Sequence, residues 1–401
     1  MKTSNRIFIL CAAAALLLPG IITGCGRSVP ADSDTAGTSF TVPASSAPQE
    51  DVTKTHTYSG FSEEAGETMR DLTDSYGAAA VQLALLDGED IKTFCYGYAD
   101  LDTLRPVTDG TKYRVASLSK LVVAAVFMKA AEQGYVDENE DISVYFGEEC
   151  RNPRYPDTVI TPLMLMTHTA SLAVEKSYVY YEGLFSERDT YLPTQPGTEY
   201  EYSNFGYCVL ACLTERATGR PLSELAQEYL FAPLGIDASF EYGSLQDTSD
   251  VGEIYGEGGL SPETLSGMKS KGLGVDLSLG AGNLIISAKD YVKLLGVLIH
   301  EGSDVDGEAV LSAGTVEEML TARFSQPGFD VAYGSQIQTD VIEGETVYVH
   351  TGSAYGMYAA YVFDPVAKRA AVVLTTGEER LADDNGVYAL CLELIREIWD
   401  A

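Results

Sequence analysis

Apolar and polar residues alternate along the chain in two ways, which together predict a sheet and a set of helices. Apolar runs at 79–86 and 91–98 read as strands and are joined across Asp87-Gly88-Glu89-Asp90, a hairpin signal. Further strands are predicted much later, at 333–342, 345–350, 356–363 and 369–375. Helical patterns lie between the two groups at 117–133, 161–167, 205–218, 222–231 and 288–301, and at the ends of the domain at 61–75 and 386–399. We therefore predict an α/β fold of the α+β kind: an antiparallel sheet built from both chain ends, flanked by terminal helices, with a large helical insertion.

The first residues have a different pattern. Lys2 and Arg6 precede an apolar stretch at 7–19 that is short for a membrane span, and Cys25 follows. This resembles a bacterial lipoprotein signal, which implies a signal peptide at 1–24 and lipid on Cys25; an ordinary secretory signal with a chance cysteine is the alternative. Residues 25–58 are rich in Ser, Thr, Ala and Pro, which predicts a disordered linker before a folded domain at 59–401. We expect an extracytoplasmic protein, anchored by lipid to the bacterial cell membrane.

Candidate chemistry begins with Ser117-Leu118-Ser119-Lys120. Lys120 lies three residues after Ser117, on the same face of a helix that is apolar nearly all round at 121–131. Burial lowers the pKa of a lysine, so Lys120 can act as the base that accepts the proton of Ser117. The spacing alone is weak evidence, since it recurs in Ser266-Gly267-Met268-Lys269 without a buried helix around it.

Two later segments could complete a site around Ser117. Tyr202-Ser203-Asn204 lies in a Gly- and Tyr-rich loop just before the helix at 205–218. His350-Thr351-Gly352 follows a predicted strand at 346–350, where glycine lets a ligand approach the backbone. Each segment taken singly is more often structural, but their order along one chain favours a serine-nucleophile site.

These segments resemble those of the serine β-lactamase and DD-peptidase superfamily, most closely its class C, serine-type carboxypeptidase and esterase branch. The similarity covers about residues 60–401 and implies a β-lactamase/transpeptidase-like fold. Further segments resemble the framework of that branch: Leu163-Met164-Leu165-Met166-Thr167-His168-Thr169, Pro196-Gly197-Thr198-Glu199-Tyr200, Ala232-Pro233-Leu234-Gly235-Ile236 and Gly280-Ala281-Gly282.

The resemblance also implies the roles of individual residues. Ser117 would be the acylated nucleophile, Lys120 its activating partner and Tyr202 the proton shuttle. The backbone amides of Ser117 and Ser353 would form the oxyanion hole. The substrate would be bound by Asn204, His350, Thr351 and Gly352, with Asn204 holding its amide and Thr351 its carboxylate. His168 resembles a structural position of the family.

The histidine at position 350 departs from many relatives. Many β-lactamases and penicillin-binding proteins carry lysine there, next to the carboxylate site. A histidine with an ordinary pKa of about 6.5 is neutral about half the time near that pH. We therefore expect a carboxylate anchor that is weaker or depends on pH, which favours peptides or esters over β-lactams.

Composition excludes several other functions. The net charge is −33, and removing residues 1–24 with Lys2 and Arg6 leaves 24 basic against 59 acidic residues, or −35, so we expect no nucleic acid partner. The four histidines are scattered, which predicts neither a metal site nor a cofactor. Cys208 and Cys212 share a helix face and are interpreted as core residues, although a disulfide elsewhere stays possible.

The leading hypothesis is a lipid-anchored serine hydrolase that forms an acyl-enzyme on wall-type D-amino-acid peptides, β-lactams or small esters. One alternative is a binding or sensing protein of the same fold that acylates without turnover. Another is an extracellular scaffold, which leaves the buried lysine without a purpose. The sequence leaves the natural substrate and the oligomeric state open, as well as whether segment 241–279 borders the cleft.

Overall fold

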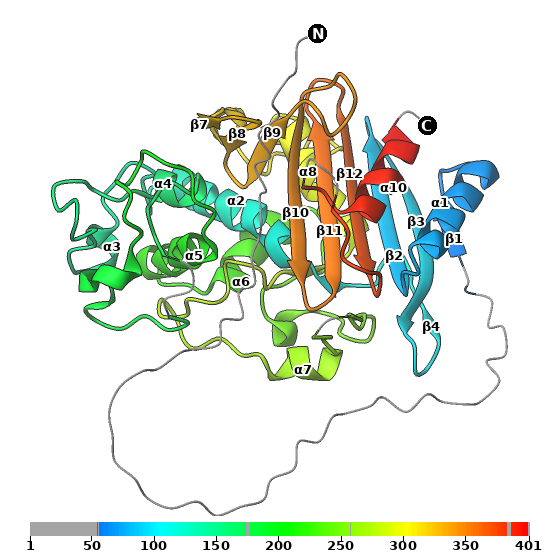
Figure 1. Ribbon diagram of the computed structural model, residues 1–401, viewed down its shortest axis with the longest axis horizontal. Helices are drawn as coiled ribbons and strands as arrows, with labels where there is room; N and C mark the ends of the chain where they lie inside the picture. The colour runs from blue at the N-terminus through cyan, green and yellow to red at the C-terminus, as the bar shows by residue number, and fades with distance from the viewer. Residues whose placement is uncertain (1–53, 55, 174–176, 257, 383–385, 400–401) are drawn as a thin grey trace, which may run out of the picture. The chain divides into compact units, whose positions relative to one another are not determined.

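A ten-stranded antiparallel sheet forms one side of the folded unit, and a helical region lies beside it (Figure 1). The computed structural model describes residues 54, 56–173, 177–256, 258–382 and 386–399. The strands in spatial order are β1 (His56–Ser59), β3 (Asp90–Asp100), β2 (Ala80–Asp87), β12 (Arg369–Thr376), β11 (Met357–Asp364), β10 (Val347–Ala354), β9 (Ser335–Gln338), β8 (Phe329–Ala332) and β7 (Phe324–Gln326), and β4 (Arg105–Pro106) pairs with β3. Two short strands, β5 (Tyr113–Arg114) and β6 (Ile285–Ile286), pair separately.

The two ends of the domain meet in the middle of the sheet. β2 near the beginning pairs with β12 near the end, from Asp87 opposite Arg369 to Ala80 opposite Thr376. β2 and β3 form the predicted hairpin, with Asp87 opposite Asp90. The prediction of an antiparallel sheet built from both chain ends is therefore confirmed.

The sheet separates two hydrophobic cores. Along β11, Tyr361 and Phe363 belong to the core shared with the helical region, whereas Tyr358 and Val362 belong to the core on the opposite face. Successive side chains of a strand point to opposite faces, so a strand buried on both sides reads as a continuous apolar run. The apolar runs in the sequence therefore predicted these strands, but they could not show which of the two cores each residue joins.

Helices cover both faces of the sheet. The helices α1 (Glu63–Ser75) and α10 (Ala389–Trp399) contact each other on one face, and α8 (Ala288–Ile299) packs on the other against β2 and β12. The helical region contains α2 (Ser119–Glu132), α3 (Ser143–Phe146), α4 (Pro162–Met166), α5 (Asn204–Thr218), α6 (Leu222–Ala226), α7 (Pro262–Gly267) and α9 (Ala313–Leu320). Short turns of helix are η1 (Ala116–Leu118), η2 (Leu184–Ser186), η3 (Arg188–Thr190), η4 (Gln227–Phe231) and η5 (Tyr242–Ser244).

Some boundaries differ from the sequence predictions. The strand expected at 346–350 continues as β10 to Ala354, because its pairing with β11 extends to Ala354 opposite Met357. The sequence did not predict β7, β8 or α9, whose residues are partly exposed and lack a long apolar period. The strand β1 lies partly within the predicted linker at 25–58, since His56–Ser59 pairs with β3.

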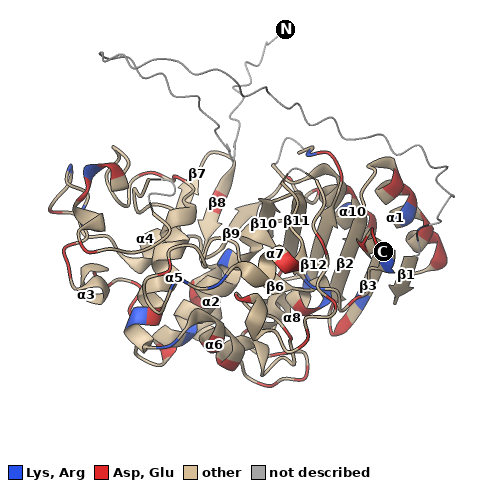
Figure 2. Cartoon of the chain, turned by 90° about the horizontal axis from the view of Figure 1, so that it is seen from below, with Lys and Arg blue, Asp and Glu red and all other residues tan. Residues whose placement is uncertain are grey.

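The predicted signal peptide at 1–24, Cys25 and most of the linker lie outside the described residues. Within the described part of the chain, no helix has the length and apolar character needed to cross a membrane. Asp and Glu residues are spread over the helices and loops of the sheet side and the helical side alike (Figure 2). The acidic charge is thus distributed over the surface and does not mark one binding patch.

Candidate active site

Ser117 lies in the tight turn η1, directly before α2. Ala116, the residue before it, has φ of 49°, a backbone conformation that non-glycine residues seldom adopt. The turn is held by Ser119, whose hydroxyl donates to the carbonyl of Ala116 at 2.7 Å and accepts from the amide of Leu284 at 3.0 Å. Strained backbone of this kind clusters at functional sites. The turn leaves the Ser117 side chain partly exposed, whereas Lys120 behind it is fully buried.

The ammonium nitrogen of Lys120 has three polar neighbours. Its Nζ lies 2.9 Å from Ser117 Oγ, 2.8 Å from Asn204 Oδ1 and 2.8 Å from the carbonyl oxygen of Ala281. The amide and carbonyl oxygens can only accept hydrogen bonds, but the hydroxyl can also donate. A neutral lysine therefore fits this site, because two N–H groups serve the two oxygens and the lone pair faces the Ser117 proton.

Burial, with a smaller contribution from the positive charge of Arg114, lowers the pKa of Lys120 to about 7, and the neighbouring Cys208 only partly opposes this. The loss of hydration in the apolar helix α2 is the main cause, since the charged form of a lysine is disfavoured away from water. At neutral pH a substantial fraction of Lys120 is therefore neutral. It is positioned to accept the Ser117 proton, as the sequence predicted.

Tyr202 lies beside this pair, just before α5. The Lys120 nitrogen is 5.0 Å from the centre of the Tyr202 ring, and the His168 ring packs against the same ring at 4.4 Å between centroids. Burial raises the pKa of the Tyr202 phenol, and its hydrogen bond with Ser117 only partly opposes this. Tyr202 therefore remains protonated. It is suited to pass a proton on, while Lys120 is the stronger candidate for the resting base.

His168 supports Tyr202 from behind. Its Nδ1 accepts a hydrogen bond from the backbone amide of Ser203 at 3.0 Å, which places the proton of a neutral ring on Nε2. Burial holds the pKa of His168 well below its usual range. Ser203 in turn caps α5 by accepting from the amide of Gly206 at 3.0 Å. These contacts fix Tyr202 and Asn204 at the start of the helix.

His350 lies in β10 and faces the same group, with its ring 6.0 Å from that of Tyr202. Its Nδ1 is 2.7 Å from the carbonyl of Thr351. Burial, followed by the positive charge of Lys120, lowers the pKa of His350 to about 3. Desolvation keeps this imidazole uncharged near neutral pH, so of the two expectations for a carboxylate anchor, a weaker one and a pH-dependent one, the structure favours the weaker.

The strand β10 passes directly against the nucleophile turn. A Cβ atom at Gly352 would lie 2.6 Å from the carbonyl oxygen of Val115 and 3.3 Å from the amide nitrogen of Ser117. Only glycine permits this approach. It brings the backbone leading to Ser353 next to the amide of Ser117, which is the arrangement that an oxyanion hole requires.

The side chains of Thr351 and Ser353 lie on the opposite face of β10 from the side chain of His350. They share the alternation of Val347 and Val349, which face the core beneath α1 and α10, and the Ser353 side chain contacts Tyr388. The side chains at 117, 120, 202 and 350 are brought together on the face that carries Ser117.

Arg114 is a further charged residue that the sequence analysis missed. Its Nη2 donates to Asn283 Oδ1 at 2.8 Å, and its guanidinium lies 5.2 Å from the centre of the Tyr355 ring. Within the described part of the chain, its buried Nη1 has no hydrogen-bond partner. Its place in a two-residue strand three positions before Ser117 gives no sequence signal, because the burial depends on the distant residues 283 and 355.

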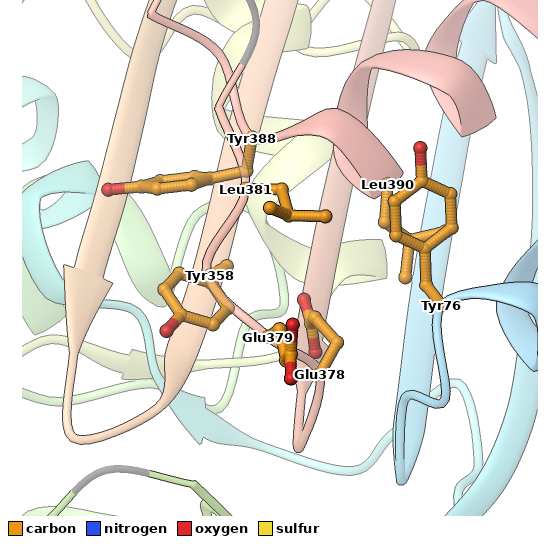
Figure 3. A pocket seen from close by; sticks show the side chains of 7 residues that line it. All are labelled: Tyr76, Tyr358, Glu378, Glu379, Leu381, Tyr388 and Leu390. Atoms are coloured by element: carbon orange, nitrogen blue, oxygen red, sulfur yellow. The ribbon is translucent and has the colours of Figure 1, made fainter.

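A hollow between the sheet and α10 is lined by tyrosines and carboxyl groups (Figure 3). Here Thr375 donates to Oε1 of Glu378, and among the described residues Oε2 of Glu378 has no hydrogen-bond partner. Burial raises the pKa of Glu378 to about 7. Tyr388, which lines this hollow, also contacts Ser353.

Cysteines and a loop tyrosine outside the site take structural positions. Cys95, Cys150, Cys208, Cys212 and Cys391 are buried free thiols. Tyr180 packs against Phe146 and its hydroxyl donates to Glu148 at 2.7 Å, which is ordinary loop packing. Among the residues with described positions, no group of three His, Cys, Asp or Glu side chains is arranged to hold a metal ion.

Segment 241–279 reaches the end of the strand beside the site. Gly356 approaches Tyr255 so closely that a Cβ atom there would lie 2.1 Å from the Tyr255 carbonyl oxygen, and Gly258 packs near Tyr355. The segment therefore borders the turn between β10 and β11.

The site combines a serine hydroxyl that is hydrogen-bonded to a buried lysine with a neighbouring phenol and a strand that contains a closely packed glycine. These groups meet where the antiparallel sheet adjoins the helical region. This arrangement is that of a serine hydrolase of the β-lactamase and DD-carboxypeptidase type. The chain belongs to this family, because residues 66–393 match the family described as Beta-lactamase.

Individual relatives agree with this classification. The chain is 31% identical over 190 residues to D-alanyl-D-alanine-carboxypeptidase/endopeptidase AmpH of Escherichia coli K12, a match that covers 42% of this chain and about half (49%) of the relative. It is 24% identical to the putative penicillin-binding protein PbpX of Bacillus subtilis, covering 73% of this chain and 72% of PbpX. The structure of a β-lactamase/D-alanine carboxypeptidase from Pseudomonas syringae superposes with a TM-score of 0.68 at 18% identity, covering 84% of this chain and 98% of that one, which shows the shared fold.

Proposed function

We propose that this protein is a serine hydrolase that works through an acyl-enzyme on Ser117, acting on D-amino-acid peptides, β-lactams or small esters. The observation that carries the proposal is the contact set of Lys120, which supports a neutral lysine facing the Ser117 hydroxyl. The carboxypeptidase, endopeptidase and penicillin-binding relatives support the substrate classes.

The reaction follows from the positions of the groups. Lys120 accepts the Ser117 proton as Oγ attacks the substrate carbonyl, and the amides of Ser117 and Ser353 stabilise the oxyanion. The tetrahedral intermediate collapses with the acyl group on Oγ, while Tyr202 gives its proton to the leaving atom and takes back the proton held by Lys120. Water then attacks the ester, Lys120 accepts the proton of the water, and this proton returns to Oγ as the acyl–oxygen bond breaks, which restores the Ser117 hydroxyl and neutral Lys120.

The proposal includes an extracytoplasmic location with lipid on Cys25. It is supported by the basic, apolar and cysteine-containing order of residues 1–25. Replacing Cys25 with serine in the producing bacterium is expected to move the protein out of the membrane fraction and to remove the lipid mass. Unchanged fractionation and mass in the variant would contradict the anchor and leave the chemistry untouched.

Acylation is tested by intact mass spectrometry with 4-nitrophenyl acetate and a fluorescent penicillin. Label that appears and decays in the wild type, and is absent in Ser117→Ala, supports a turning-over enzyme. Ser266→Ala is the matched control, since the exposed Ser266 near the end of α7 repeats the spacing with Lys269, which lies beyond that helix. A label that does not decay would favour the binding protein without turnover. The absence of label from both the wild type and Ser117→Ala would support the extracellular scaffold.

A further inference from the structure

The side chain of Arg114 lies where three segments of the site meet. Its own segment leads from β5 to Ser117, three residues further along the chain. Its guanidinium forks onto one oxygen, with Nε 3.3 Å and Nη2 2.8 Å from Asn283 Oδ1. The same guanidinium lies 5.2 Å from the centre of the Tyr355 ring, in the turn between β10 and β11. One side chain therefore contacts both segments that adjoin the nucleophile turn.

The segment that contains Asn283 supplies one of the oxygen acceptors of Lys120. The backbone amide of Asn283 donates to the carbonyl of Leu279 at 3.4 Å, which closes a turn. Within this turn, the carbonyl oxygen of Ala281 lies 2.8 Å from Lys120 Nζ. A glycine stands on each side of Ala281 and brings no side chain that could hold the turn. The position of this carbonyl therefore depends on what its neighbours contact.

Backbone contacts join the next residue, Leu284, to the nucleophile segment. The amide of Val115 donates to the Leu284 carbonyl at 2.9 Å, and the amide of Leu284 donates to Ser119 Oγ at 3.0 Å. The fork from Arg114 is a side-chain contact that holds Asn283 itself. A substitution at Asn283 is therefore expected to loosen the turn, while the backbone pairing of β5 with β6 stays in place.

Tyr355 lies at the end of the strand that carries the Ser353 amide. Its φ of 60° is a conformation that non-glycine residues seldom adopt, so the turn needs contacts that hold it. A guanidinium is attracted to the face of an aromatic ring, which Arg114 offers here. Gly352 of the same strand already packs against Val115, the residue after Arg114. Arg114 thus adds a side-chain contact to the backbone approach of β10.

Stability alone does not explain this arginine. Its partners are an amide oxygen and an aromatic ring, both neutral, and among the described residues its Nη1 has no hydrogen-bond partner. Burial lowers the pKa of the Arg114 guanidinium, and Tyr355 only partly opposes this. Burying a charge among neutral partners and leaving a donor unpaired are both costly. The place of the guanidinium between the segments of the site gives it a role that offsets this cost.

Resting on the proposed function, we infer that Arg114 is a positioning residue for the acylation step. It holds the turn that carries Ala281 against Lys120, and it holds the end of β10 beside the nucleophile. It acts through Asn283 and Tyr355 and does not itself meet the substrate.

Asn283→Ala tests the first contact while leaving the charge of Arg114 in place. We expect kcat/KM for 4-nitrophenyl acetate on the plateau of the pH profile to fall by at least about 10-fold, because the groups around the nucleophile are less well positioned. The ascending limb of the profile should also move to lower pH by about half a pH unit or more. The reason is that the ammonium form of Lys120 loses a hydrogen-bond acceptor, which lowers its pKa.

The titratable side chains around Lys120 are unchanged in this variant. They are Tyr202, Tyr207, Cys208, His168, His350 and Arg114. A loss of folded protein would lower the rate and leave the limb at the same pH. The position of the limb therefore distinguishes a positioning role from a loss of stability.

Asn283→Asp is the conservative variant, because a carboxylate also accepts from the guanidinium fork. It is expected to recover most of the rate lost in Asn283→Ala. Asn139→Ala, at an exposed position between α2 and α3, is the control for removal of an amide side chain. The inference is overturned if Asn283→Ala keeps the wild-type limb, whatever its rate, or if Asn283→Asp is as impaired as Asn283→Ala.

Tyr355→Leu tests the second contact, and Tyr355→Phe is the matched variant that keeps the ring. Loss of the ring is expected to lower kcat/KM several-fold on the plateau, because the end of β10 is held less firmly. Tyr355→Phe should keep most of the rate. Equal rates in the two variants would overturn the part of the inference that concerns β10.

The wild-type protein with 4-nitrophenyl acetate separates this inference from the proposed function. If acylation depends on Ser117 and Asn283→Ala behaves as the wild type does, the positioning inference fails and the hydrolase assignment stands. If the wild type is not acylated at Ser117, the proposed function fails, and the positioning inference with it.

Discussion

Burial lowers the pKa of two basic side chains in the site, with different consequences for each. It brings Lys120 to about 7, where a lysine exchanges its proton near neutrality, and His350 to about 3, where an imidazole is inert. Lys120 begins from a higher intrinsic pKa and is held by two oxygens that can only accept hydrogen bonds. His350 has the carbonyl of Thr351 as its partner. Desolvation thus makes Lys120 a base near neutral pH and keeps the His350 ring uncharged.

The pH dependence of the reaction tests the role of Lys120. We expect kcat/KM to rise with pH through about 7, since the neutral lysine is the active form. Arg114→Gln removes a neighbouring positive charge, so the ammonium form becomes more stable, the pKa rises, and the ascending limb moves to higher pH. Activity at pH 6 should then fall several-fold. Arg114→Lys, which keeps the charge, is the matched control, and a limb at the same pH in both variants would contradict this role.

Glu378 gives a second prediction at this scale, about stability. Its folded pKa is raised to about 7 from 4.5, so the folded state binds more protons between these values and the free energy of unfolding falls as pH rises from 4.5 to 7. A shift of this size corresponds to roughly 3 kcal/mol. Glu378→Gln should lose this dependence and gain stability relative to the wild type at pH 8. Denaturant unfolding at pH 5 and pH 8 checks this prediction, with Glu379→Gln, at an exposed position, as the control. If the free energy of unfolding changed equally with pH in the wild type and in Glu378→Gln, the prediction would be contradicted.

At the scale of elements, the site depends on where β10 ends. The sequence pattern ended the strand at 350, because Thr351-Gly352-Ser353 lacks apolar residues and contains a glycine. Pairing with β11 extends β10 to Ala354, so that the strand runs past η1. Helices were easier to predict, since α2 and α5 are long apolar runs, and α5 has an N-cap serine and a glycine at its end.

The close approach of β10 to η1 can be tested at Gly352. Gly352→Ala would place a methyl group 2.6 Å from the Val115 carbonyl oxygen, so one of the two elements must move. A misplacement of about 1 Å can cost on the order of 100-fold in rate. We expect kcat/KM for 4-nitrophenyl acetate to fall by about that factor. Gly314→Ala, in the exposed first turn of α9, is the matched control, and near wild-type activity in Gly352→Ala would show that the contact does not position the oxyanion hole.

At the scale of the whole molecule, the fold joins residues that are distant in sequence. Ser117 and Lys120 come from the helical insertion, and His350 comes from the strand β10 of the sheet that the pairing of β2 with β12 joins from both chain ends. The acidic surface is spread over both parts (Figure 2), so general electrostatics gives no strong attraction for an anionic substrate.

The sequence by itself determined the family, the order of most elements and the residues of the candidate site, because periodicity and short motifs are local properties of a chain. Only the tertiary structure decided the charge states of Lys120 and His350 and the unpaired nitrogen of Arg114. These depend on desolvation and on contacts between segments more than a hundred residues apart, and no local pattern encodes them.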